Sequence, residues 1–247
     1  MEMKESRIDF YDETGELLPI EEVQDMVATA YNEVAEITSK QDQIYPKYSI
    51  LTELIDPEAR IEGSDALHTL AFLERELYLS DEITSDMANA FRDAINFWNR
   101  VDDIDDVPIE KRKPIKIYIN TPGGDITATF LIIDCIKLSQ TPVWTITTGC
   151  GYSGGFFIGI SGHKRFGFPQ SSYLFHEGCK GDLGDAHKFL QGARFYEKML
   201  TKLKKITIDN TKINDEIYEK YKKDDLWLFA EEAKELGIID EVIETLI

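Results

Sequence analysis

Residues Thr148 to Phe156, Thr-Gly-Cys-Gly-Tyr-Ser-Gly-Gly-Phe, decide the fold of this chain. An apolar, β-branched run from Val143 to Thr147 precedes them, and a second apolar run begins at Phe156. This order predicts a strand that runs into a tight, glycine-lined turn, and then a helix that begins at or just after Ser153. A hydroxyl at a helix N-terminus lies close to unpaired N–H groups, which favour developing negative charge. Ser153 is therefore a candidate nucleophile, although a glycine-rich turn with a helix-capping serine has the same pattern.

Length and composition describe a globular protein of one large domain, or of one domain with an appendage. The chain has 247 residues, of which 43% are hydrophobic, and a formal net charge of −19. Such a charge argues against nucleic-acid partners and against anionic membrane surfaces. Three cysteines imply no disulfide framework, and no apolar run approaches membrane-spanning length. We expect a cytoplasmic protein, and we predict no cofactor and no metal site.

The first 65 residues differ from the rest of the chain. Ile8 and Phe10 alternate before a glycine turn, which predicts a small hairpin. Apolar residues then recur at helical spacing across the acidic segment 20–39, which predicts an amphipathic helix. We therefore divide the chain into an acidic N-terminal extension, residues 1–65, and a second domain, residues 66–247.

From Ala71 onward, strands, glycine turns and helices alternate. Strands are predicted at 73–79, 115–119 and 143–147, and a helix capped by Thr84 or Ser85 lies between the first two. A second glycine turn, residues 120–125, follows the middle strand. Repeated strand–turn–helix units imply an α/β fold around a mainly parallel sheet, with the glycine turns at the carboxyl ends of its strands.

Two motifs in this order resemble the caseinolytic protease ClpP family of self-compartmentalised serine peptidases. The motifs are Asn120-Thr-Pro-Gly-Gly-Asp-Ile-Thr-Ala128 and Gly151-Tyr-Ser-Gly-Gly155, and the similarity runs from about Leu73 to Ile243. The resemblance implies a ClpP/crotonase-like fold, polypeptide substrates and a Ser-His-Asp triad. It also implies a homo-oligomer in the form of a double ring, and an AAA+ unfoldase as a possible partner.

A serine nucleophile needs a base to take its proton. Of the four histidines, His176 ends the apolar strand 172–175, where a sheet fixes its neighbours, and it matches the histidine of the family. His68 precedes the core, His163 lies in a polar stretch, and His187 begins an amphipathic helix. His176 is therefore the predicted base.

The family resemblance supplies the remaining site residues. Counting back without gaps from the closing segment Ala230-Glu-Glu-Ala233 implies Asp225 as the triad acid, and a slip of one residue gives Asp224. Capping a helix is the other role open to both aspartates. The backbone N–H groups of Gly124 and Gly154 are the implied oxyanion hole.

A long helix, predicted at 185–209, resembles the handle that joins two rings in the family. Its apolar seam of Phe189, Ala193, Tyr196, Leu200 and Leu203 predicts contact with another helix. The chain departs from the family pattern at Gly151, Gly154 and Glu177-Gly178, which affects the shape of the substrate groove.

Three functions fit these patterns. A serine endopeptidase is favoured because all three triad positions are filled. A crotonase-like acyl-CoA enzyme needs only the paired glycine N–H groups, and an inactive relative needs only the assembly surfaces.

Overall fold

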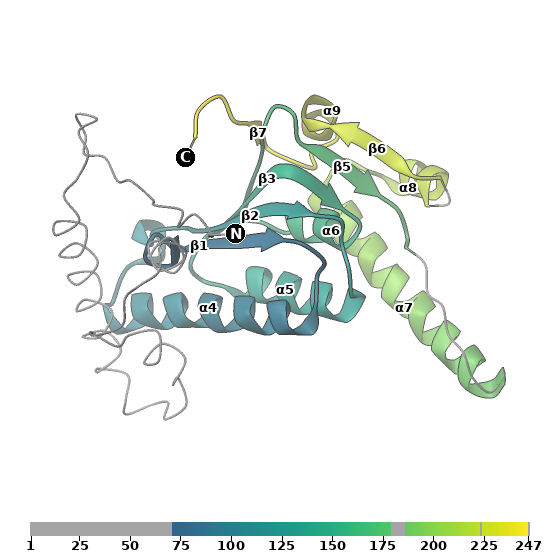
Figure 1. Cartoon of the computed structure of the whole chain (residues 1–247), viewed down its shortest axis with the longest axis horizontal. Coiled ribbons are helices and arrows are strands. Elements are labelled where there is room, and N and C mark those ends of the chain that lie inside the picture. Colours follow the sequence, from purple (N-terminus) through teal and green to yellow (C-terminus); the bar gives the residue numbers. More distant parts are fainter. Residues whose placement is uncertain (1–70, 179–185, 223, 247) are drawn as a thin grey trace, which may run out of the picture. The chain divides into compact units, whose positions relative to one another are not determined.

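The computed structural model describes residues 71–178, 186–222 and 224–246 (Figure 1). The chain divides into two units, Met1–Glu74 and Arg75–Ile247, and the described residues fall almost entirely in the second. The predicted hairpin, the predicted acidic helix and the boundary predicted between residues 65 and 66 all lie outside the described residues. They stay predictions.

The strands of the second unit form one mostly parallel sheet, which confirms the predicted α/β class. Five parallel strands lie side by side in the order β1 (Glu76–Ser80), β2 (Ile115–Thr121), β3 (Val143–Tyr152), β4 (Lys164–Gly167) and β7 (Glu241–Val242). Strand β3 is shared, because its first half pairs with β4 and its last residues pair in parallel with β5 (Ser172–Phe175). Strand β6 (Leu226–Phe229) is antiparallel to β5.

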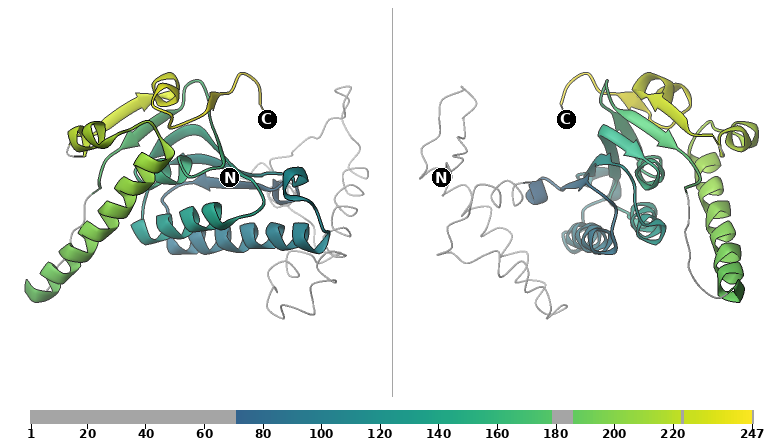
Figure 2. Two further views of the ribbon diagram at one scale, coloured as in Figure 1. Left: turned by 180° about the vertical axis from the view of Figure 1, so that it is seen from behind. Right: turned by 45° about the vertical axis from the view of Figure 1, so that its right-hand side comes forward.

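Helices cover the sheet and extend beyond it. They are α4 (Ser85–Ile104), the 3₁₀ turn η1 (Ile109–Lys111), α5 (Ile126–Leu138), α6 (Gly154–Gly159), α7 (Ala186–Asn210), α8 (Asp215–Tyr221) and α9 (Ala230–Glu235). Figure 1 shows α4 and α5 side by side along the sheet, and the views of Figure 2 show α7 projecting away from it. The predicted handle helix is therefore present, with its bounds moved by one residue.

Local sequence explains where these elements begin and which faces they bury. The Thr84 side chain accepts a hydrogen bond from the Met87 backbone N–H, which caps α4 and confirms Thr84 over Ser85. The buried stripe of α4 begins at Ala88 and includes Phe91 and Trp98. Within the described ranges, no helix is both long enough and apolar enough to cross a membrane.

Two predicted boundaries are wrong. Residues 71–73 are helical and Arg75 has a φ of 60°, so β1 begins at Glu76 rather than at Leu73. Strand β3 does not end at Thr147 but continues to Tyr152, because Cys150 and Tyr152 pair with β5. The glycines before Tyr152 therefore belong to a strand, and the turn is confined to Ser153.

Candidate active site

Ser153 joins the end of β3 to the start of α6, as predicted. Its φ of 52° and ψ of −116° are unusual for a residue with a side chain, and such backbone strain is concentrated at functional sites. The Ser153 hydroxyl makes no helix-capping hydrogen bond. The Ser153 side chain therefore does not cap α6, which was the other role that the sequence allowed. Its hydroxyl is available for chemistry.

The turn after β2 lies directly against the serine. A Cβ added to Gly123, whose φ is +105°, would come within 2.7 Å of the Ser153 Cβ, which is too close for two carbon atoms. Only glycine permits this approach, because a side chain would push the two loops apart. The two glycine motifs, 30 residues apart in the sequence, thus meet in space.

The two predicted oxyanion donors lie next to each other beside Ser153. The Gly124 nitrogen is 3.6 Å from the position that a Cβ on Gly154 would take. That same Cβ would collide with Thr129 Oγ1 at 2.6 Å, so Gly154 must lack a side chain. Within the described part of the chain, neither of these two glycine N–H groups has a hydrogen-bond acceptor. Unpaired backbone donors of this kind are what an oxyanion hole requires.

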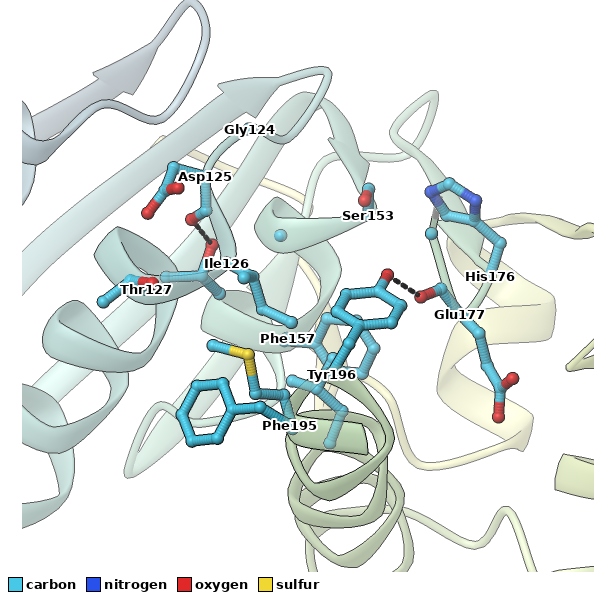
Figure 3. Close-up of a pocket in the computed structure, with 15 residues that line it drawn as sticks. Gly124, Asp125, Ile126, Thr127, Ser153, Phe157, His176, Glu177, Phe195 and Tyr196 are labelled. Carbon is cyan, nitrogen blue, oxygen red and sulfur yellow. Dashed lines mark hydrogen bonds between the residues drawn. The ribbon is translucent and has the colours of Figure 1, made fainter. Parts of the chain in front are cut away.

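Strand pairing positions the predicted base. The Ser153 backbone N–H donates to the Leu174 carbonyl at 3.0 Å, and Tyr152 pairs with the same residue. His176 follows two residues later, just beyond the end of β5, and is half-buried. Figure 3 shows His176 and Ser153 in one pocket, whose lining also includes Gly124 and Gly154.

The antiparallel pairing of β5 with β6 bears on the choice of acid. The last pair joins Phe175 to Leu226, so the next step of the same register places His176 opposite Asp225. Directly opposite residues of an antiparallel pair point to the same face, with Cβ atoms about 5 Å apart. This register favours Asp225 over Asp224. Neither aspartate caps a helix, because α8 ends before them and the N-cap of α9 is Phe229.

The strand pairings bring the three predicted triad residues near one another, but hydrogen bonds do not connect them. Among the described residues, no hydrogen bond links Ser153, His176 and Asp225 to one another, and Asp225 is exposed and does not line the pocket. Catalytic hydrogen bonds are often long in the absence of substrate and shorten when it binds. The arrangement is therefore compatible with a triad that completes itself on substrate binding.

Other candidate groups are less suited to catalysis. Burial raises the pKa of the Cys150 thiol, which lowers its reactivity, and the thiol contacts Asn120 Oδ1 at 3.5 Å. His163 is exposed, and its Nδ1 accepts a hydrogen bond from the Val143 backbone N–H at 2.9 Å. His68 and the side chain of His187 lie outside the described residues.

The pocket has a volume of about 620 Å³ and an apolar end that the sequence did not reveal. Its apolar side chains come from α5, α6 and α7, and they are Ile126, Phe157, Phe195, Met199 and Leu203. Two residues of the seam predicted for another helix, Tyr196 and Leu203, line this pocket together with Phe157 of α6. The C-terminal half of α7 thus contacts another helix, as predicted, and that helix belongs to the same chain.

A parallel sheet whose strand ends bring together a strained serine, a histidine and two unpaired glycine N–H groups defines a candidate serine hydrolase. The sequence profile of one family, Clp protease, matches residues 61–246. The chain therefore belongs to the Clp protease family. This assignment confirms the predicted family and enzyme class, a serine-type peptidase, and it weighs against the acyl-CoA alternative.

Two curated relatives carry the same description. An ATP-dependent Clp protease proteolytic subunit 2 from Treponema pallidum is 31% identical over 192 residues, which cover 76% of this chain and 92% of the relative. The protein of that name from Treponema denticola is 38% identical over 132 residues, which cover 53% of this chain and 66% of the relative.

Proposed function

We propose that this chain is the proteolytic subunit of an ATP-dependent protease and that it cleaves unfolded polypeptides with a Ser153–His176–Asp225 triad. The observation that carries the proposal is the pairing of β5 with both β3 and β6. This pairing supports the triad, because His176 directly follows the strand that pairs beside the strained Ser153, and one further step of the β5–β6 register would bring it opposite Asp225.

Each residue has a defined role in peptide-bond hydrolysis. Ser153 Oγ attacks the carbonyl carbon of the substrate while His176 takes the hydroxyl proton, and Asp225 orients the imidazole. The N–H groups of Gly124 and Gly154 stabilise the oxyanion of the tetrahedral intermediate. His176 then gives the proton to the leaving amine, and an acyl-enzyme forms. Water, deprotonated by His176, hydrolyses the acyl-enzyme and restores the serine.

A fluorophosphonate probe tests this chemistry, because an activated serine attacks its phosphorus, expels fluoride and becomes phosphonylated. We expect stoichiometric labelling of Ser153, located by peptide mass spectrometry, and loss of activity in proportion to labelling. The activity assay uses a short peptide with leucine before the scissile bond, since the pocket next to Ser153 is apolar at one end. An unlabelled Ser153 in assembled protein contradicts the serine-peptidase mechanism and favours the inactive alternative.

The apolar surface of α7 supports the proposal of a homo-oligomer. Phe189, Leu190 and Phe195 are about half exposed along this projecting helix. Closed rings bury such a surface by repeating one interface, and two rings joined through α7 would enclose the active sites. We infer a double ring that works with an AAA+ unfoldase in the cytoplasm.

Leu190→Glu tests this interface, because a charge cannot be buried there without a partner. We expect mass photometry to show a large ring assembly for the unmodified protein and a smaller assembly for this variant. Leu138→Glu is the matched control, since Leu138 is 82% exposed on α5 and should tolerate the charge. The assembled protein should cleave short peptides alone and folded proteins only with an unfoldase. A stable monomer that cleaves folded proteins unaided rules out the chamber.

A further inference from the structure

Residues on both sides of His176 are held by two tyrosines from neighbouring helices. The ring of Phe175, which precedes the histidine, lies 5.0 Å from the ring of Tyr218 in α8. The carbonyl of Glu177, which follows the histidine, accepts a hydrogen bond from Tyr196 Oη at 3.1 Å, shown dashed in Figure 3. The short segment that carries the base is therefore fixed through its neighbours rather than through its own side chain.

Tyr218 is the less expected of the two tyrosines. Its side chain is 1% exposed, and its hydroxyl is the buried side-chain polar group left without a hydrogen-bond partner in the described residues. Native proteins satisfy nearly all such groups, so this exception calls for an explanation. The ring itself is well packed, since Lys204 Nζ lies over it at 5.3 Å from the centroid.

Glu177 is the available partner for this hydroxyl. Burial and the charge of the neighbouring Glu177 carboxylate raise the pKa of Tyr218, so the phenol stays protonated and can only donate to that carboxylate. Figure 3 shows the Glu177 side chain turned away from Ser153, with its carboxylate on the far side of the segment from the catalytic hydroxyl. The carboxylate is close enough to raise the pKa of the phenol, yet the phenol hydroxyl makes no hydrogen bond to any described residue.

We propose that Tyr218 is a positioning residue for His176, and that its hydroxyl donates to the Glu177 carboxylate when substrate completes the site. With Tyr196 on the carbonyl and Tyr218 on the carboxylate, Glu177 is held at two points. The imidazole one residue earlier then keeps the orientation that proton transfer from Ser153 requires. This inference rests on the proposed peptidase function and adds a residue to it.

Tyr218→Phe removes the hydroxyl and keeps the packed ring. We expect kcat to fall about tenfold with KM changed by less than about twofold, because a misplaced base slows chemistry without weakening substrate binding. The rate constant for fluorophosphonate labelling of Ser153 should fall by the same factor, while the mass of the assembly and its Tm stay unchanged. Tyr221→Phe makes the same change on the same helix, away from the pocket lining, and should leave all five quantities unchanged.

A double-variant comparison shows whether Tyr218 acts through Glu177. Glu177→Ala should slow labelling to a similar extent, and the double variant should be no slower than the worse single variant, since both remove one interaction. Additive losses overturn the inference, as does Tyr218→Phe with an unchanged labelling rate or with a loss that follows disassembly. An unmodified protein whose Ser153 resists the probe overturns the peptidase function itself, and this inference with it.

Discussion

Ser153→Ala should abolish peptide hydrolysis and fluorophosphonate labelling while leaving the fold and the assembly intact. In the proposed mechanism the hydroxyl attacks the substrate, and removal of the nucleophile of another serine protease lowers kcat about a millionfold. Since the hydroxyl makes no capping bond, its loss removes no structural contact of that kind. Alanine has to adopt the same left-handed backbone as serine, so we expect Tm to change by only a few degrees.

Cys150→Ser is the matched control for this experiment. Cys150 lies three residues earlier on β3, and its raised thiol pKa makes it a poor nucleophile. We therefore expect Cys150→Ser to keep activity within about twofold of the unmodified protein, as for a residue outside the reacting groups. Full activity in Ser153→Ala together with loss in Cys150→Ser would assign the nucleophile to the cysteine.

The sequence predicts the site well where local signals and tertiary structure agree. An apolar strand, flanking glycines and an apolar helix start identify the turn at Ser153, and all of these features are local. The position of His176 follows from the same logic, because a strand end is visible in the run Ser172–Phe175. Gly124 comes from the family resemblance, and its unpaired N–H beside Ser153 is visible only in the structure.

Features that depend on pairing between distant segments are not predictable in this way. Gly149 to Gly151 look like a turn, yet they form a strand because β5, more than twenty residues later, supplies hydrogen-bond partners. A Cβ on Gly149 would come within 2.3 Å of Asn120 Oδ1, so close approach to the neighbouring loop explains this glycine better than a turn does.

Helix α7 shows a second limit of prediction from the sequence: the partner of an apolar helix face cannot be identified. Its apolar residues recur at spacings that suit any neighbouring helix, and the sequence does not say whether that neighbour is in the same chain. In the structure, the two ends of the helix differ in burial. Leu203 is 3% exposed, whereas Phe189 is 49% exposed. Nothing in the sequence singles out Tyr218, since a tyrosine in a charged helix carries no signal before the fold brings it beside Phe175.

Asp225→Asn should lower kcat roughly 10⁴-fold, as the equivalent change does in another serine protease, because the amide favours the wrong tautomer of the base. KM should change little, since the exposed Asp225 side chain does not line the pocket. The prediction depends on the register of β5 and β6, which brings His176 opposite Asp225 when it is continued by one residue beyond the last observed pair.

Asp224→Asn tests whether Asp225 or Asp224 faces His176. The two substitutions make the same chemical change at neighbouring positions. Continued by two residues beyond the last observed pair, the β5–β6 register brings Asp224 opposite Glu177 rather than opposite the base, so its loss should leave kcat within about threefold. The measurement is the rate of fluorophosphonate labelling and of peptide hydrolysis for both variants at equal assembled mass. If Asp224→Asn shows the large loss and Asp225→Asn does not, the pairing at the end of β6 shifts by one residue when the triad forms. If both variants stay active, a different group orients His176, and the acid of the triad has to be sought outside β6.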